Sequence, residues 1–422
     1  MPLNSMADAL SGLQANQEFM NVVGNNIANV NTTGYKTQNV VFEDLLSQNM
    51  GYGSMATAGG LDGTNPTQIG LGVGNGATEM VNTQGSVQDT GRISDMAIQG
   101  GGYFVVNNGQ QSFYTRDGSF NVAPDGTLES GTTGMKVQGW TQLNADGTVN
   151  TTSPLSAVKI PLNSQNASAS TNVGLAGNLD ATQAVFAAGT PPTGGQFTTT
   201  ITVYDSQGTA HQLAATFQKT ATNTWSYSIV SPTGNTDITT ITGNTGSLTF
   251  DANGALKTPT TQPTLAITYA NGTAAGAVTV DMSKVSQLAE TSQVNVATVD
   301  GTPGGTLATY SVAKDGTITA VYSNGNSKVI GQMALADFRN TDGLIRDGSN
   351  LFSAGINSGQ PQIGQAGVGT LGTIGTGQLE GSNVDLAAQF AQMIQAQQGF
   401  NANTKVVTTT NSMLQAVISI VP

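Results

Sequence analysis

Three features of the sequence could indicate a catalytic or ligand-binding site: aspartates that precede glycine, two glycine-rich patterns and a single histidine. Aspartate is followed at once by glycine at several positions, among them Asp117, Asp125, Asp146, Asp315, Asp342 and Asp347. Their spacing does not form the D-x-[DN]-x-[DN]-G loop that binds calcium. Because Asp-Gly is preferred in tight turns, we predict turns at these positions. A carboxylate pair assembled from distant strands is the alternative that spacing leaves open.

The glycine patterns and the histidine could serve a cofactor or a metal. The pattern G-x-G-x-x-G/A occurs at residues 72–77 and 367–372, but neither has both the preceding strand and the following helix of a dinucleotide site, so we predict linkers. The chain has no cysteine and one histidine, His211, which excludes thiolate zinc sites and paired imidazoles. His211 shares strand parity with Leu213 and Phe217, which favours a packed sheet residue. We therefore predict no catalytic residue, no metal and no cofactor.

Composition narrows the possible partners. The 422 residues include 13 Lys and Arg against 25 Asp and Glu, which gives a net charge of −12 with only 9% charged residues. Nucleic acids and anionic membranes both require clustered basic residues, so neither is expected as a partner. No stretch approaches the roughly 18 to 20 apolar residues that insert in a bilayer. The first basic residue is Lys36, so the start lacks the basic region of a cleaved signal peptide.

Both ends of the chain have helical periodicity. Apolar residues recur at alternating steps of three and four, with Val23 widening the stripe: Met6, Leu10, Leu13, Met20, Val23 and Ile27 near the start, and Leu386, Phe390, Met393, Phe400, Val407, Leu414 and Ile418 near the end. This seam predicts long helices that form a coiled-coil base, although a buried helix of a globular domain is the ordinary alternative. Ser5 with Asp8, and Ser382 with Asp385, have the spacing of N-terminal capping boxes.

The middle of the chain has the period of two that is typical of strands. Trp225, Tyr227 and Ile229 alternate with polar residues, and Asp-Gly and Asn-Gly turns are frequent, so we predict antiparallel sheets. The expected fold is multidomain and mainly β, with a helical coiled-coil base formed by both ends and nested, discontinuous antiparallel β domains. The expected borders are 1–33 and 378–422 for the helical core domain, 34–78 and 364–377 for the glycine-rich connecting segment, 79–144 and 298–363 for the inner β domain, and 145–297 for the outer β domain.

The seam suggests that the chain polymerises. The free-energy cost of ordering the backbone of two long ends exceeds the free energy that burial within one pair of helices provides. Packing among identical copies, in contrast, buries several faces of each helix. We therefore predict that the seam residues form subunit interfaces, and that the ends are mobile in the monomer and become ordered on polymerisation.

Two segments resemble the signatures of the bacterial flagellar rod and hook axial proteins. The first covers residues 24–36 and the second residues 379–386; their signature residues are Asn25, Asn26, Ala28, Asn29, Gly34, Tyr35, Lys36, Glu380, Ser382, Asn383 and Asp385. Residues 101–106, 114–120 and 137–140 are similar to the β domain that these proteins share. Residues 203–208, followed by His211 and Trp225, look like the outer domain of the hook members of the family.

The resemblance implies a structural subunit of the flagellar hook and not an enzyme. Copies of such a subunit self-assemble helically into a short curved tube, a universal joint that transmits torque from rod to filament. Its partners would be identical subunits, the rod and hook–filament junction proteins, the hook cap and the type III export apparatus. The expected location is extracellular, in the hook and basal body. The alternatives are a distal rod protein of the basal body and, from a different class, a secreted β-rich adhesin.

Overall fold

The computed structural model describes residues 2–53, 63, 65–162, 164–189 and 192–420. The chain divides into two compact units. The first unit comprises Met1–Ile160, Ser311–Thr319 and Val329–Pro422, and the second comprises Pro161–Tyr310 and Ala320–Lys328. The first unit therefore contains both ends of the chain, as the sequence predicted for a discontinuous arrangement.

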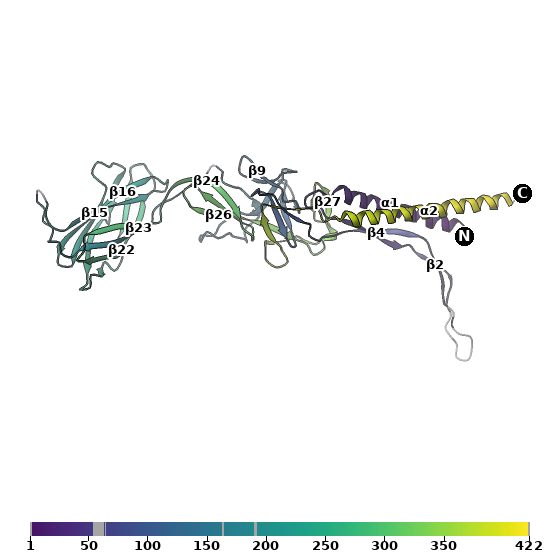
Figure 1. Cartoon of the computed structure of the whole chain (residues 1–422), viewed down its shortest axis with the longest axis horizontal. Coiled ribbons are helices and arrows are strands. Elements are labelled where there is room, and N and C mark those ends of the chain that lie inside the picture. Colours follow the sequence, from purple (N-terminus) through teal and green to yellow (C-terminus); the bar gives the residue numbers. More distant parts are fainter. Residues whose placement is uncertain (1, 54–62, 64, 163, 190–191, 421–422) are drawn as a thin grey trace. The chain divides into compact units, whose positions relative to one another are not determined.

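Both ends form helices, α1 (Pro2–Ala28) and α2 (Leu386–Ile420), which pack against each other (Figure 1). The capping boxes predicted at their starts are wrong. Because α1 begins at Pro2, Ser5 lies inside the helix, and proline is well suited to a first helical turn. The N-cap of α2 is Asp385, whose Oδ1 accepts hydrogen bonds from the backbone N–H of Ala387 (2.9 Å) and Ala388 (3.2 Å).

Small and polar residues form the contact between the two helices. A Cβ atom on Gly12 would lie 2.5 Å from Nδ2 of Asn403, and one on Gly399 would lie 2.6 Å from Oδ1 of Asn16. The residue number rises from Gly12 to Asn16 in α1, whereas it falls from Asn403 to Gly399 in α2. The two helices are therefore antiparallel. The buried residues among the described side chains of α1 and α2 are Ala9, Gly12, Ala15, Val23, Asn26, Gln389, Ala396 and Thr410. Only Val23 belongs to the predicted seam, so the internal contact runs beside that seam and not along it.

A β-hairpin follows α1 and packs on it. Strand β1 (Gln38–Asp44) pairs with β4 (Val73–Met80), and β2 (Ser47–Gly51) pairs with β3 (Thr67–Gly70), both antiparallel. Phe19 of α1 and Phe42 of β1 meet edge to face with ring centroids 5.7 Å apart. The glycine-rich stretch expected to be a connector thus contains paired strands; its residues 54–62 lie outside the described part of the chain.

The rest of the first unit is built of strands from both halves of the chain. Two small sheets each join an early to a late strand: β5 (Val87–Asp89) with β31 (Gln378–Glu380), and β6 (Met96–Gln99) with β30 (Thr373–Thr376). The larger sheet contains β7 (Tyr103–Asn107), β8 (Ser112–Thr115), β9 (Phe120–Val122), β10 (Leu128–Ser130), β11 (Lys136–Trp140), β12 (Ser156–Ala157), β26 (Ser327–Asp337), β27 (Ile345–Gly348), β28 (Leu351–Ser353) and β29 (Gln362–Gln365). The short helix η1 (Thr341–Gly343) lies between β26 and β27 in the sequence. Its aromatic core includes Tyr114 and Phe338, whose rings meet edge to face at 4.8 Å.

The second unit contains two five-stranded sheets that share one hydrophobic core. The first sheet has the order β18-β21-β22-β14-β23 and the second β15-β16-β17-β19-β20. Their bounds are β14 (Asn172–Asp180), β15 (Gln196–Tyr204), β16 (Ala210–Ala221), β17 (Thr224–Val230), β18 (Ile238–Thr242), β19 (Thr245–Phe250), β20 (Leu256–Thr258), β21 (Thr264–Tyr269), β22 (Gly276–Leu288) and β23 (Gln293–Val299). Three further strands are β13 (Gln165–Ser168), β24 (Thr302–Val312) and β25 (Thr317–Tyr322); the boundary between the units falls within β24, β25 and β26.

The strand predictions for the second unit are confirmed with one correction. Trp225, Tyr227 and Ile229 are buried on alternate positions of β17, as the period of two requires. However, β14 pairs with β22 in parallel, so the prediction of purely antiparallel sheets is wrong at this pair. The chain runs from β14 through seven intervening strands before it returns as β22, which gives ample length for a parallel connection.

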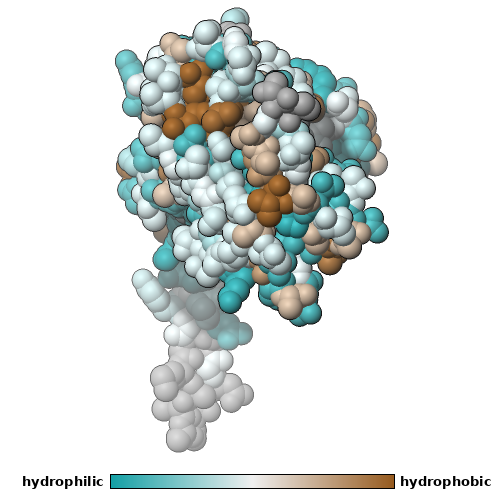
Figure 2. Space-filling model, turned by 90° about the vertical axis from the view of Figure 1, so that its left-hand side faces the viewer, coloured by the Kyte–Doolittle hydropathy of each residue, from teal (hydrophilic) through white to brown (hydrophobic). Residues whose placement is uncertain are grey.

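Three of the six turns predicted at Asp-Gly pairs form as expected, since Gly126, Gly147 and Gly316 have positive φ. The glycines of three Asn-Gly pairs, Gly254, Gly272 and Gly325, also have positive φ. The other three predictions are wrong: the side chain of Asp117 accepts the N–H of Ser119 in place of a backbone turn, Asp342 lies in the short helix η1, and Asp347 lies in strand β27, after which the turn falls at residues 349–350. Figure 2 faces the strands β15 and β16, which lie at the left of Figure 1. Most of this face is pale or teal, and brown apolar residues occur only in small separate groups (Figure 2).

Candidate functional site at the junction of the chain ends

A buried carboxylate lies where α1 ends and α2 begins. Oε1 of Glu380 is 2.7 Å from Nζ of Lys36, and Oε2 of Glu380 is 3.3 Å from Nη1 of Arg116. The exposed fractions of these side chains are 0%, 1% and 5% for Glu380, Lys36 and Arg116. We call this group the ion cluster. It joins residues that follow α1, precede α2 and lie in the β part of the first unit.

Backbone groups also bind each member of the ion cluster, although Nε of Arg116 is buried without a hydrogen-bond partner. Lys36 donates to the carbonyl of Thr83 (2.7 Å), and Arg116 donates to the carbonyl of Gly100 (2.8 Å). Oε1 of Glu380 also accepts the N–H of Gly85 at 2.9 Å. Burial lowers the pKa of Lys36, and the charge of Glu380 and its hydrogen bond oppose that shift. Glu380 is therefore the group that makes it possible to bury two cations here.

A fully buried asparagine connects the ion-cluster region to both helices. Nδ2 of Asn26 donates to the carbonyl of Gln38 (2.8 Å) and to Oε1 of Gln389 in α2 (3.0 Å). Its Oδ1 accepts the N–H of Gln38 (3.0 Å) and lies 3.1 Å from the hydroxyl of Tyr35. All four hydrogen-bonding positions of this amide are used. Asn26 thus fixes the end of α1 against the first turn of α2.

Tyr35 and Asn383 attach the segment after α1 to the rest of the unit. The guanidinium of Arg346 lies 5.3 Å from the centre of the Tyr35 ring and donates to the carbonyl of Lys36 (2.7 Å). Burial raises the pKa of Tyr35, and Arg346 opposes that shift. Oδ1 of Asn383 accepts both the N–H (2.8 Å) and the hydroxyl (2.7 Å) of Thr37.

Gly34 is required by a close approach of two backbones. Its φ is +69°, and a Cβ atom there would lie 2.7 Å from the backbone N of Asp117 and 2.8 Å from the backbone C of Arg116. Its N–H donates to the carbonyl of Glu380 at 2.8 Å. The residue therefore brings the chain that leaves α1 into contact with the strand that carries Glu380.

The signature residues divide into those that meet and those that act locally. Asn26, Tyr35, Lys36, Glu380 and Asn383 form one connected region, which Asn25 joins through the Tyr35 hydroxyl (3.0 Å). Four others act on neighbouring backbone or are exposed: Asn29 bonds the carbonyl of Asn25, Ser382 accepts the N–H of Val384, Asp385 caps α2, and Ala28 is exposed.

Sequence reasoning missed several members of this region. Arg116, Gln389 and Arg346 were not predicted as site residues. Arg116 lies in a segment that resembled the family's β domain, but nothing in its spacing indicated a buried partner 264 residues away. A basic residue in a chain with so few of them was the signal that could have directed attention to it.

Five of the thirteen predicted interface residues are exposed on the helix pair, seven are half-buried, and only Val23 is buried. The exposed fractions are 38% for Met6, 52% for Leu10, 52% for Phe390 and 72% for Ile418. Leu386 is also exposed, while Leu13, Met20, Ile27, Met393, Phe400, Val407 and Leu414 are half-buried. A stripe of large apolar side chains therefore remains uncovered within one chain, and we call it the apolar seam.

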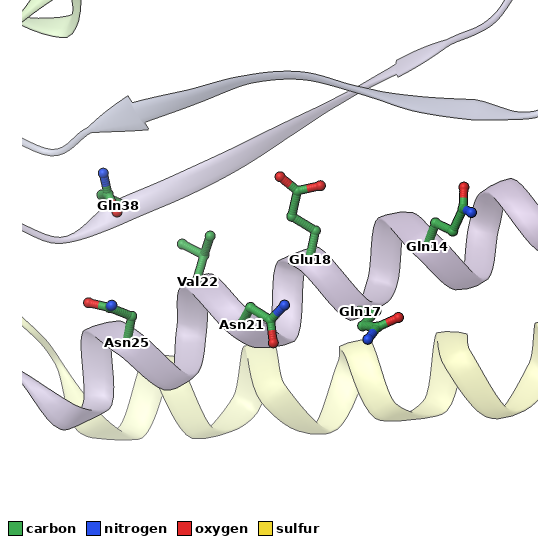
Figure 3. Close-up of a pocket in the computed structure, with 7 residues that line it drawn as sticks. All are labelled: Gln14, Gln17, Glu18, Asn21, Val22, Asn25 and Gln38. Atoms are coloured by element: carbon green, nitrogen blue, oxygen red, sulfur yellow. The ribbon is translucent and has the colours of Figure 1, made fainter. Parts of the chain in front are cut away.

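A polar groove lies between α1 and the strand β1 (Figure 3). Its volume is about 540 Å³, and it is lined by Gln14, Gln17, Glu18, Asn21, Val22, Asn25 and Gln38. Figure 3 shows the carboxylate of Glu18 extending from α1 toward the strands. We call this feature the amide groove, because five of its seven lining residues carry amide side chains.

The histidine that could have served a catalytic or metal site has a structural role. His211 is buried, stacks on Tyr269 with centroids 4.4 Å apart and lies 3.2 Å from Oδ2 of Asp205, so the prediction of a packed sheet residue is confirmed. Across the described residues, no three His, Cys, Asp or Glu side chains come together in a way that could hold a metal ion. Within the same part of the chain, no helix is long and apolar enough to cross a membrane.

Family models match most of the chain. Residues 7–36 match "Flagella basal body rod protein", residues 97–180 match "Flagellar hook protein FlgE/F/G D1 domain", residues 178–302 match "Flagellar basal body protein FlaE D2 domain", and residues 376–420 match "Flagellar basal body rod FlgEFG protein C-terminal". The first and last of these cover the two segments that meet at the ion cluster.

Curated relatives align along the whole length. The chain is 35% identical over 448 residues to the flagellar hook protein FlgE of Borreliella burgdorferi, with 99% of each chain covered. It is 36% identical over 461 residues to the flagellar hook protein FlgE of Treponema pallidum, again with 99% of each chain covered. The crystal structure of the Helicobacter pylori flagellar hook protein FlgE2 aligns with 68% of this chain and 98% of that one, at 17% identity and a TM-score of 0.47.

Proposed function

The chain belongs to the family of flagellar hook proteins, and on that premise we propose how it works: copies stack helically through their helical ends into a short curved tube that transmits torque from rod to filament. Hook proteins are structural subunits, and theirs is not a family of enzymes. The proposal treats the identical subunit as the main partner and the flagellum as the location.

One observation carries the proposal: the apolar seam is left over after the chain has folded. Internal contact between α1 and α2 uses glycine, alanine and asparagine, whereas Leu10, Phe390 and Ile418 stay exposed. Burying a side chain of this size stabilises by about 1.5 to 3 kcal/mol. A stripe of them on both helices therefore favours association strongly, and in a homopolymer each stripe meets helices of neighbouring copies.

The ion cluster provides a second argument for the same proposal. A subunit that transmits torque needs a firm connection between its interface helices and the rest of its body. Lys36, Glu380 and Arg116 provide that connection within the first unit, since they tie both helix ends to the β strands. Breaking such a buried arrangement costs about 3 to 5 kcal/mol, which is large enough to resist bending at this point.

We also propose the further details that the family resemblance implied. The domain borders are 1–33 with 378–422, 34–78 with 364–377, 79–144 with 298–363, and 145–297. The subunit works outside the cell, is exported by the type III apparatus without a cleaved signal peptide, and contacts the hook cap, the rod and the junction proteins. Proteolysis of the purified chain would test the border near residue 145, where cleavage should occur because residues 144–148 are exposed and contain a turn.

Polymerisation of purified protein tests the central proposal. Wild-type chain should form tubes that are visible by electron microscopy, and removal of residues 386–422 should abolish them. The point variants Leu10→Ser and Phe390→Ser should raise the critical concentration at least about tenfold each, given the burial energy of these side chains. Val185→Ser, at an equally exposed apolar residue of the second unit, is the control. If the seam variants polymerise like the control, the seam is not the interface.

A further inference from the structure

The charges of the helical ends are few and are placed asymmetrically. Helix α1 carries two acids, Asp8 and Glu18, and no base. Helix α2 carries one charged residue along its whole length, Lys405. Both Glu18 and Lys405 are exposed, and neither belongs to an ion pair found in the described part of the chain.

These two charges cannot meet within one chain. The antiparallel register places Asn16 beside Gly399 and Gly12 beside Asn403. Glu18 lies two residues beyond Asn16 in one direction, and Lys405 lies two residues beyond Asn403 in the other. At 1.5 Å per residue, the two Cα levels are separated by roughly 12 Å along the helix axis. Each charge must therefore find its partner outside its own subunit or remain in solvent.

The surroundings of Glu18 favour a cation. Glu18 lines the amide groove, and its carboxylate extends from α1 toward the strands (Figure 3). The carboxylate also accepts a hydrogen bond from Nδ2 of Asn75. The hairpin that forms the other wall carries Glu43, Asp44 and Glu79 and has no Lys or Arg between residues 38 and 80. The field over this groove is consequently negative, and the amides around it offer acceptors for an ammonium group.

The surroundings of Lys405 match the amide groove. The exposed residues one helical turn before and after Lys405, on the same face of α2, are small or polar: Asn401, Ala402, Thr408 and Thr409. The adjacent Val406 is exposed as well, but it points to the side of that face. Such a surface can enter a polar groove without burying large apolar groups, and its hydroxyl and amide groups can exchange hydrogen bonds with the groove. Complementary charge on matching polar surfaces selects a partner and its register.

We propose that the amide groove of one subunit receives helix α2 of a second copy of this chain, with Lys405 of that copy paired to Glu18. This inference depends on the proposed homopolymer. It adds to that homopolymer a specific polar contact beside the apolar seam. Apolar contacts along the seam are non-directional, so they select a register less strictly than a charge pair does. A single charge pair is satisfied in one register only, so it fixes how neighbouring subunits are staggered.

A charge-exchange experiment tests the proposal. Glu18→Lys and Lys405→Glu should each raise the critical concentration for polymerisation at least about tenfold, because each creates a like-charge contact. The double variant Glu18→Lys/Lys405→Glu restores opposite charges and should return to within about threefold of wild type. Asp8→Lys with Lys405→Glu is the matched control and should not recover, since Asp8 is the other acid of α1.

Cross-linking provides a geometric test, and the chain has no cysteine of its own to interfere. Glu18→Cys and Lys405→Cys subunits, mixed and polymerised under mild oxidation, should yield dimers that contain one of each. A mixture of Glu79→Cys and Lys405→Cys should yield few. Normal assembly of both single charge variants, or rescue by the Asp8 exchange, would overturn the proposal. Sensitivity to Glu18→Lys alone would mean that a different partner fills the groove and would overturn it as well. If wild type itself does not polymerise, the proposed function fails and not only this contact.

Discussion

Removing the charge of Glu380 is the sharpest perturbation of the junction between the chain ends. Glu380→Gln keeps the shape of the side chain and an acceptor oxygen, but leaves Lys36 and Arg116 buried with no counter-charge. Removing one partner of a buried ion pair destabilises by about 3 to 5 kcal/mol. Because a folded domain is stable by only about 5 to 15 kcal/mol, this variant should lose a large part of the stability of the first unit.

The two tryptophans make the measurement specific to one unit. Trp140 is buried in the first unit and Trp225 in the second, so in a Trp225→Phe background the fluorescence reports the first unit alone. Urea unfolding in that background gives the free energy of unfolding with and without Glu380→Gln. Glu79→Gln, at an exposed glutamate of the same unit, should change it by no more than about 0.5 kcal/mol. A loss below about 1 kcal/mol for Glu380→Gln would refute the reasoning.

The pH dependence of the variant gives an independent check with a definite sign. Burial lowers the pKa of Lys36 from 10.5, and Glu380 opposes this, so the variant should lower that pKa further. The unfolded chain then binds a proton that the folded chain has released, over the pH range between the two pKa values. Stability therefore rises with pH in that range, toward 10.5, and should rise more steeply for Glu380→Gln than for wild type. A second substitution, Lys36→Met, should recover part of the loss, because it removes the unpaired charge.

Three further predictions concern single residues elsewhere. Gly34→Ala should destabilise the first unit by about 1 to 3 kcal/mol in the same urea assay, since its Cβ would lie 2.7 Å from the backbone N of Asp117 at a positive φ. Burial alone would raise the pKa of Asp205, but hydrogen bonds from neighbouring side chains and backbone hold it well below 3.8. This carboxylate therefore stabilises the second unit above that value, and Trp225 fluorescence should show the stability falling as the pH drops below about 4, less so in Asp205→Asn. Gly399→Leu should displace the side chain of Asn16 from the contact between α1 and α2, because a Cβ at residue 399 would lie 2.6 Å from Oδ1 of Asn16; hydrogen exchange should show weaker protection of both helices although leucine favours helix.

The strands and turns of the fold were predictable because local chemistry determines them. Asp125-Gly126 and Asn271-Gly272 form the turns that their residue types favour, and the alternation around Trp225 indicates one buried face. The parallel pairing of β14 with β22 was not predictable, because it depends on which strands meet after a long excursion of the chain. Local pattern carries no information about that choice.

The residues of the ion cluster were partly predictable and their geometry was not. Lys36 and Glu380 lie in segments whose resemblance to a family could be recognised, but nothing in either segment shows that the two side chains meet 2.7 Å apart. Arg116 is separated from both in sequence and has no helical or strand periodicity that would relate it to them. Buried polar networks depend on tertiary placement of single atoms, which sequence spacing does not encode.

The helical ends show why an apolar pattern does not by itself identify an internal core. Antiparallel helices that approach closely need small residues at the contact, and Gly12 and Gly399 meet that need where leucine would not fit. The large apolar residues of the same helices are then displaced to the adjoining face, as the exposure of Leu10 and Phe390 illustrates. In a protein that works as a monomer such a stripe would be a liability for aggregation. In a subunit of the proposed polymer it would be the interface, so the offset between the internal contact and the apolar seam is the feature by which we distinguish the two cases.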